Sequence, residues 1–177
     1  MKKAAISIIT LLFIFLVPTA IYLIEYSTPV RAAQESIVYN LPYPGLLPDH
    51  PLYFIKALRD KILEAMTRDN IKKAELYLLL SDKRMAMAID LVKKGKDKQA
   101  IETATKGEKY FIKIPGLLSE SKKQGVTGSS QFVDKLKLSN AKHREILENF
   151  LKDLPQGWSD SINQAIKIND EVKKALQ

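Results

Sequence analysis

Residues 40–88 read NLPYPGLLPDHPLYFIKALRDKILEAMTRDNIKKAELYLLLSDKRMAMA, and this stretch decides the fold. A proline-punctuated lead-in precedes an amphipathic helix, a four-residue break at 67–70 and a longer, more apolar helix. The rest of the chain has the pattern of further helices that pack on this pair. The sequence therefore predicts an all-α fold, an antiparallel bundle of four to five helices after an N-terminal export or transmembrane helix.

The first helix of this stretch is expected to begin at His50 or Pro51 and end at Met66, with Asp49 as its N-cap. Apolar residues recur in it at three- and four-residue spacing. This spacing predicts a stripe buried against the bundle, formed by Leu52, Ile55, Leu58, Ile62 and Ala65. The charged residues between them are expected mainly on the solvent side, namely Lys56, Arg59, Asp60, Lys61 and Glu64.

The second helix is expected to be the central one, because it is apolar on more than one side around Leu78. Asp69 or Asn70 can cap its start, and Gly95 follows its end near Lys94. Arg84 lies among its apolar positions. A buried charge there needs a carboxylate partner, and binding of an anionic ligand is the alternative.

Three more helices are expected after Gly95. One runs from about Asp97 to Ile114 and has a short bent continuation beyond Pro115, the next spans about 130–154, and the last begins with Ser159 as its cap. His143 lies on the apolar face of the helix at 130–154. We expect it at the edge of the core, with one ring nitrogen hydrogen-bonded.

The composition limits the class of protein. The chain has 177 residues, 46% of them hydrophobic and 27% charged, which is enough for one domain with a hydrophobic core. It contains no cysteine, which excludes disulfides, thiolate metal sites and a cysteine nucleophile. The formal charge is +8, and the residues after 1–32 still carry 25 basic and 19 acidic side chains, a net +6. Such a domain is expected to be attracted to anionic surfaces, and the alternative is that its lysines are ordinary solvated residues of helix surfaces.

Residues 1–32 are expected to be a signal peptide or a membrane anchor. Lys2 and Lys3 precede an uncharged run at residues 4–24, which is long enough to span a membrane. Val30 and Ala32 suit a signal peptidase site, so anchoring and cleavage both remain open. In either case the proline-rich linker and lead-in at 33–49 and the helical domain at 50–177 are expected to be extracytoplasmic. Nucleic acid is therefore not an expected partner.

The sequence contains no pattern that predicts a catalytic residue, a cofactor or a metal site. Its carboxylates lie among lysines on helix faces, and neither histidine has a second ligand at metal-site spacing. The candidates for binding an anion or a partner are weak and basic: Arg84, Lys93, Lys94, Lys96 and Lys98. The function predicted is a non-enzymatic cell-envelope module that binds an envelope protein or an anionic polymer. An envelope hydrolase or transferase with an unrecognised site is the alternative.

Part of the chain resembles a known family. The resemblance is carried by LPDHPLY at 47–53, Lys56, KAEL at 73–76, and DKR at 82–84 with Ala86 and Ala88. This order is similar to an exported bacterial helical family, described as a domain of unknown function, with an L-P-x-x-P-L-Y-x-x-K opening. The resemblance covers roughly residues 41–111. It implies export and long helices, and it assigns no functional residue.

Overall fold

The structure, a computed structural model, describes residues 37–177, so the predictions for residues 1–36 lie outside the described residues. The described residues all belong to one compact unit. Its described elements are α-helices and one 3-10 turn: α2 (Tyr53–Met66), α3 (Asn70–Lys93), α4 (Asp97–Phe111), α5 (Ile114–Lys123), α6 (Ser130–Asp153), η1 (Gln156–Trp158) and α7 (Ser159–Ala175). No strand occurs in this part of the chain, and the all-α prediction is confirmed.

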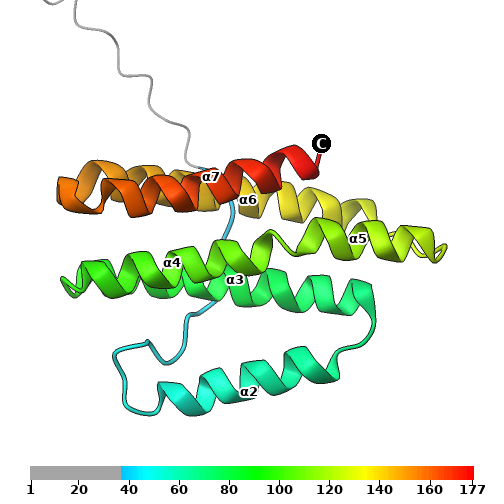
Figure 1. The fold of residues 1–177 in the computed structure, drawn as a ribbon, viewed down its shortest axis with the longest axis horizontal. Helices are drawn as coiled ribbons and strands as arrows, with labels where there is room; N and C mark the ends of the chain where they lie inside the picture. The colour runs from blue at the N-terminus through cyan, green and yellow to red at the C-terminus, as the bar shows by residue number, and fades with distance from the viewer. Residues whose placement is uncertain (1–36) are drawn as a thin grey trace, which may run out of the picture. The chain divides into compact units, whose positions relative to one another are not determined.

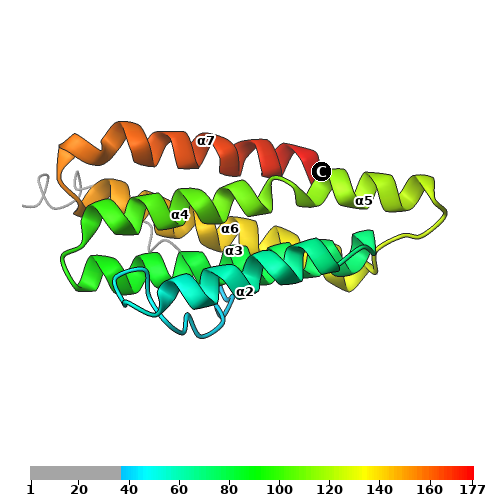
Figure 2. The same cartoon turned by 60° about the horizontal axis from the view of Figure 1, so that its bottom comes forward.

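The helices lie roughly along one direction in three layers (Figures 1 and 2). The middle layer is the antiparallel pair α3 and α4, with α5 continuing from α4 and also packing on α3. The antiparallel pair α6 and α7 covers one side of this layer, and α2 lies on the other side. The prediction that the second helix is central is confirmed, since α3 contributes to both core clusters.

Local capping chemistry sets several helix ends, of which those at Asp69 and Gly95 were predicted. The Asp69 carboxylate accepts a hydrogen bond from the backbone N–H of Lys72 at 2.8 Å, which caps α3. Gly95 follows α3 with φ +68°, a left-handed conformation that glycine adopts without strain. The Ser129 hydroxyl accepts from the Phe132 N–H at 3.2 Å and caps α6.

Two predicted caps are wrong. Helix α2 begins at Tyr53, and the Asp49 carboxylate lies instead 3.2 Å from Lys94 Nζ and 2.9 Å from Lys96 Nζ. Lys94 and Lys96, in the turn between α3 and α4, thus bind the side chain that was predicted to cap α2. Ser159 is the first residue of α7 and not its cap, because the 3-10 turn η1 leads directly into the helix.

A glycine allows close packing of α3 against α4. A Cβ atom at Gly107 would lie 3.2 Å from the backbone oxygen of Ser81 and 3.3 Å from Cβ of Arg84. The Ser81 hydroxyl donates to the Gly107 carbonyl oxygen at 2.9 Å across the same contact. These distances are shorter than an ordinary van der Waals contact, so glycine permits this close approach of the two helices.

Helix α2 has the opposite orientation to the one its apolar stripe predicted. The only buried residue of α2 is Asp60, and four members of the predicted stripe are exposed large apolar side chains, namely Leu52, Ile55, Leu58 and Ile62. Ala65 is exposed as well. Lys56, Asp60 and Glu64, predicted mainly on the solvent side, face the bundle. The prediction of a buried stripe on α2 is therefore wrong.

Candidate functional site

A cluster of buried charged residues joins three helices at the centre of the bundle. His143 of α6 is 0% exposed, and its imidazole lies between two carboxylates. Nδ1 is 2.8 Å from Oε1 of Glu108 on α4, and Nε2 is 3.1 Å from Oδ1 of Asp82 on α3. Both carboxylates are buried as well. The prediction of a core-edge histidine with one bonded nitrogen is wrong, because both nitrogens have partners.

Further polar side chains surround the Asp82 end of this cluster. The Ser139 hydroxyl donates to Oδ1 of Asp82 at 2.6 Å, and the Tyr39 hydroxyl donates to Oδ2 at 2.6 Å. Burial, followed by the hydrogen bond to Asp82, raises the pKa of Tyr39, so its hydroxyl remains a donor. The lead-in is thereby attached to the centre of the helical domain.

The Glu108 end of the cluster extends to α7. Asn169 Nδ2 donates to Oε2 of Glu108 at 3.4 Å and to the backbone oxygen of Asn140 at 3.0 Å. Asn140 Nδ2 returns a bond to the backbone oxygen of Asn169 at 3.1 Å. The cluster therefore links α3, α4, α6 and α7, and its polar atoms are hydrogen-bonded, as buried polar groups require.

His143 is a cation in the folded protein at neutral pH. Burial alone lowers its pKa, but the hydrogen bonds with Asp82 and Glu108 and the charges of these carboxylates outweigh burial. The pKa is raised from 6.5 to about 9. Because its pKa is higher in the folded protein than in the unfolded chain, protonated His143 stabilises the fold. This contribution to the free energy of unfolding is complete below pH 6.5 and is lost as the pH rises through 9.

The free energy of unfolding is therefore expected to fall between pH 6.5 and 8 by roughly 1–1.5 kcal/mol. The slope is below its limit of about 1.4 kcal/mol per pH unit because the unfolded histidine is half-protonated at pH 6.5. Urea unfolding at a series of pH values measures this change. The pH range ends at 8 because burial lowers the pKa of Lys56 to about 8. Above that pH the folded protein binds fewer protons at Lys56 than the unfolded chain does, so this lysine makes the free energy of unfolding rise with pH.

A Glu108→Gln variant tests the cause of this pH dependence. It removes one of the two carboxylates that raise the pKa of His143, so the fall should be shallower than in the wild type. A wild-type free energy of unfolding that stays constant from pH 6.5 to 8 would show that His143 is neutral in the folded protein.

The geometry of the cluster gives it a structural role. A general base needs a free ring nitrogen within reach of a substrate proton, and both nitrogens of His143 are bound to carboxylates. A serine nucleophile needs a hydrogen bond to the base, but the Ser139 hydroxyl donates to Asp82. Within residues 37–177 no group of three or more histidine or acidic side chains is arranged to hold a metal ion.

Sequence reasoning missed the buried carboxylates, although the helical period contained a signal for them. Glu108 lies four residues after Ala104 and three before Phe111, and both of these neighbours are core residues. Asp82 lies four residues after the buried Leu78. A carboxylate at a core position of each helix, together with His143 on a third apolar face, indicates a buried ion cluster.

The inward face of α2 is polar and binds the bundle through specific groups. Lys56 Nζ donates to the carbonyl oxygens of Pro44 at 2.5 Å and Leu46 at 3.1 Å, which holds the lead-in loop. Glu64 accepts hydrogen bonds from the hydroxyls of Tyr77 at 2.7 Å and Tyr110 at 3.4 Å. Burial raises the pKa of Glu64, but the hydrogen bond from Tyr77 and the charge of Lys113 outweigh it and lower the pKa.

The opposite side of α2 forms an exposed apolar surface, which we call the outer face of α2. Its members are at successive positions of one helical face: Phe54, Ile55, Leu58, Ile62 and Met66. Met66 is 74% and Phe54 66% exposed. Leu52 and Leu63 are exposed beside them. Soluble domains rarely expose a large contiguous apolar surface, and such a surface usually marks a site of interaction with a protein or a membrane.

The basic candidates from the sequence do not form one site. Arg84 is buried in α3, donates to the backbone oxygen of Leu80 at 3.0 Å, and lies 4.4 Å from the centre of the Tyr110 ring. Among the described residues no carboxylate lies within ion-pair distance of it, so the expected carboxylate partner is replaced by an aromatic ring. Lys93 pairs with Asp90 at 3.2 Å.

Two of the remaining basic candidates are partly neutralised, since Lys94 and Lys96 both bind Asp49. Lys98 is exposed at the start of α4. The basic patch around Gly95 thus includes an internal carboxylate, and it stays a predicted binding site.

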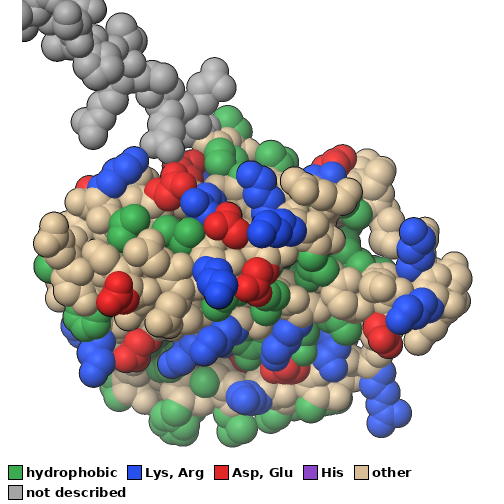
Figure 3. All heavy atoms as spheres, turned by 45° about the horizontal axis from the view of Figure 1, so that its top comes forward, with side chains coloured by type: hydrophobic (Ala, Val, Ile, Leu, Met, Phe, Trp, Pro, Cys, Tyr) green, Lys and Arg blue, Asp and Glu red, His purple; other side chains and the backbone are tan. Residues whose placement is uncertain are grey.

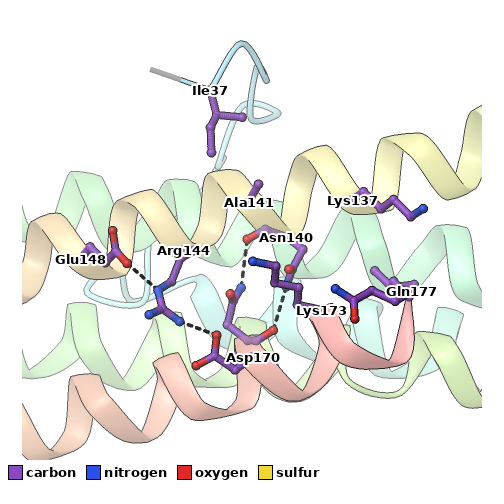
Figure 4. A pocket seen from close by; sticks show the side chains of 11 residues that line it. Ile37, Lys137, Asn140, Ala141, Arg144, Glu148, Asp170, Lys173 and Gln177 are labelled. Atoms are coloured by element: carbon purple, nitrogen blue, oxygen red, sulfur yellow. Dashed lines mark hydrogen bonds and ion pairs between the residues drawn. The ribbon is translucent and has the colours of Figure 1, made fainter. Parts of the chain in front are cut away.

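A groove of about 510 Å³ lies between α6 and α7 beside Ile37 (Figure 4). Arg144 in this groove donates to Glu148 at 2.7 Å and to Asp170 at 2.6 Å, so its charge is neutralised within the groove. The side of the molecule that carries α7 shows basic and acidic side chains interspersed (Figure 3). Neither feature offers the contiguous surface that α2 does.

The chain matches one family over residues 45–157, well over half of its length; the family is described as Domain of unknown function (DUF5667). The chain belongs to this family. The DUF5667 match begins in the lead-in loop, includes α2 through α6 and ends within η1, so it continues well past residue 111, where the resemblance ended. Helix α7, which supplies Asn169 to the buried cluster, lies outside the matched residues. No curated protein and no solved structure matches the chain.

Proposed function

We propose that the protein is a non-enzymatic module of the cell envelope, held outside the cytoplasmic membrane, that binds its partner through the outer face of α2. The observation that supports the proposal is the reversed orientation of this helix. Its charged residues face the bundle and its large apolar residues face solvent. Burying a fully exposed side chain of this size is worth about 1.5–3 kcal/mol. The five side chains of the outer face of α2 are 49–74% exposed, so a partner that covers them removes a part of this cost for each one.

The α2 helix is held in this orientation by its polar side. Rotating the helix to bury Leu58 and Ile62 would expose Glu64 and break its bonds with Tyr77 and Tyr110. It would also remove Lys56 from the carbonyl oxygens of the lead-in loop. The apolar surface is therefore a built feature of the domain, and it lies within the residues that match the family.

Single-cysteine labelling tests both the binding face and the location. The natural chain has no cysteine, so Leu58→Cys reports on the outer face of α2 alone, and Gln164→Cys on the exposed surface of α7 serves as the matched control. A membrane-impermeant maleimide is added to intact cells. Each labelling rate is divided by the rate of the same variant in denaturant.

We expect the cysteine at position 164 to react in intact cells and the cysteine at 58 to react several-fold more slowly. Equal rates would show an uncovered face and would overturn the binding role. If the cysteine at 164 reacts only after lysis, the domain is not extracytoplasmic and the location fails. The two parts of the proposal are thus tested separately.

A further inference from the structure

We propose that the outer face of α2 lies on an anionic lipid bilayer, with the helix parallel to the membrane plane and its apolar side chains between the headgroups. This inference rests on the proposed function and names the partner of the same face. Interfacial helices combine aromatic and aliphatic residues on one face with cations beside them. Helix α2 has this composition on the side that is turned away from the bundle.

The charges around the outer face of α2 are positive on the exposed side. With 3.6 residues per turn, Lys61 lies along one edge of the face and Arg59 along the other, and Arg68 follows directly after the helix. Lys61 and Arg68 are exposed and have no carboxylate partner among the described residues. Such cations extend their charged ends toward lipid phosphates while their methylene chains stay on the apolar side.

The acidic side chains of α2 are turned away from this surface. Asp60 is buried and paired with Arg59 at 2.7 Å, and Glu64 is bound by tyrosines on the inner side. A negatively charged surface therefore approaches α2 without meeting an exposed carboxylate on the helix. The exposed carboxylate that follows Arg68, Asp69, accepts the hydrogen bond that caps α3. The opposite side of the domain, over α7, lacks this asymmetry because acidic and basic side chains are mixed there (Figure 3).

A second copy of the chain fits this face less well. In a symmetric dimer the same patch meets itself, which brings Lys61 and Arg68 of both copies to one interface. The helix offers no acidic residue on that side to neutralise them, so like charges would be placed together at a cost. An anionic bilayer can bury the apolar face and also attract Lys61 and Arg68 beside it.

The length of chain before the domain is compatible with a bilayer partner. The uncharged run predicted to reach the membrane ends at Ile24, and the described structure begins at Ile37. These 13 intervening steps extend at most about 45 Å. Because Ile37 lies beside α6 and α7, on the side away from α2, α2 reaches the membrane surface only if these residues pass around the domain. Tyr43 is 84% exposed in the loop that Lys56 holds against α2, and tyrosine is favoured at membrane–water interfaces.

The test uses the full chain reconstituted into vesicles. An environment-sensitive fluorophore is attached at Leu58→Cys or, as control, at Gln164→Cys on α7, on the side of the domain opposite α2 (Figures 1 and 2). Vesicles contain phosphatidylcholine alone or phosphatidylcholine with phosphatidylglycerol, and brominated lipids report the depth of the fluorophore. We expect blue-shifted, bromine-quenched emission at 58 in the acidic vesicles, about 5–10 Å into the headgroup and acyl boundary, and neither effect at 164.

A matched pair of charge variants tests the cationic edge. Lys61→Gln with Arg68→Gln should reduce the blue shift at 58 in the acidic vesicles and leave it unchanged in phosphatidylcholine. Lys167→Gln with Lys174→Gln removes the same charge from exposed positions of α7 and should have no effect. An equal loss in both pairs would show a general charge effect and would overturn the specific role of this edge.

The outcomes separate this inference from the proposed function. If position 58 is protected in cells but its fluorophore stays in water on every vesicle, the partner is a protein, and the bilayer inference is overturned while the binding role stands. If position 58 is neither protected in cells nor shifted on vesicles, both are overturned. Equal shifts on both vesicle types would overturn the anionic requirement.

Discussion

Replacement of Leu78 by aspartate is expected to abolish the cooperative unfolding transition of the domain. Leu78 is 2% exposed on α3 and belongs to the core cluster that includes Phe111, Leu136 and Val172. Loss of a buried leucine side chain costs about 2–5 kcal/mol, and the new carboxylate is buried without a partner, which adds several more. A domain of this size has a total free energy of unfolding of about 5–15 kcal/mol.

The neighbouring residue provides the matched control for this substitution. Leu79 is the same residue type on the same helix, but it is 42% exposed. Leu79→Asp should therefore cost about 1 kcal/mol or less, measured by urea unfolding followed by circular dichroism. A Leu78→Asp protein with the same unfolding midpoint as Leu79→Asp would contradict the central position of α3.

Removal of the His143 side chain by His143→Ala is expected to cost about 3–5 kcal/mol of the free energy of unfolding. The imidazolium neutralises one negative charge and donates to both Asp82 and Glu108. Its removal leaves two buried carboxylates close together with no cation between them. Urea unfolding at about pH 7 measures the loss.

The pH dependence of this loss distinguishes charge from packing. The stabilisation by the His143 imidazolium is lost as the pH rises through its raised pKa, so the cost of His143→Ala should be smaller at about pH 8 than at about pH 6.5. A loss that is equal at both values would point to a cavity alone. The control is the exposed His50, which accepts one hydrogen bond from the Leu52 N–H; His50→Ala should cost at most about 1 kcal/mol.

Much of the fold was predictable because the signals that set it are local. The carboxylate of Asp69, the hydroxyl of Ser129 and the left-handed conformation of Gly95 each act within a few residues of a helix end. The many apolar positions of α3 likewise predicted its central place, since a helix that is apolar on several sides needs several neighbours.

The orientation of α2 was not predictable from its own pattern. An amphipathic period shows that Ile55, Leu58 and Ile62 share a face, but it does not show what covers that face. The inward side is decided by partners outside the helix: Glu64 binds Tyr77 and the more distant Tyr110, and Lys56 binds the lead-in loop. These polar contacts with other segments outweigh the tendency of the apolar stripe to face the core.

The buried cluster illustrates the same limit for the site. His143 lies 35 residues after Glu108 and 61 residues after Asp82 in the sequence, and each of the three lies on a different helix. Periodicity places each of them on an apolar face, but only the packing of α3, α4 and α6 brings the three together. The positions were readable from the sequence, whereas their pairing required the structure.

The bonds made by the lead-in have a mechanical consequence. Tyr39 is joined to Asp82 at 2.6 Å, and the Ile37 N–H donates to the Glu145 carboxylate at 3.0 Å. A tensile load applied through the upstream chain would thus arrive first at α3 and α6, in the middle of the domain, and not at a helix end. The force is then distributed over α3 and α6 together. The domain therefore resists unfolding that would proceed one helical turn at a time from its N-terminal end.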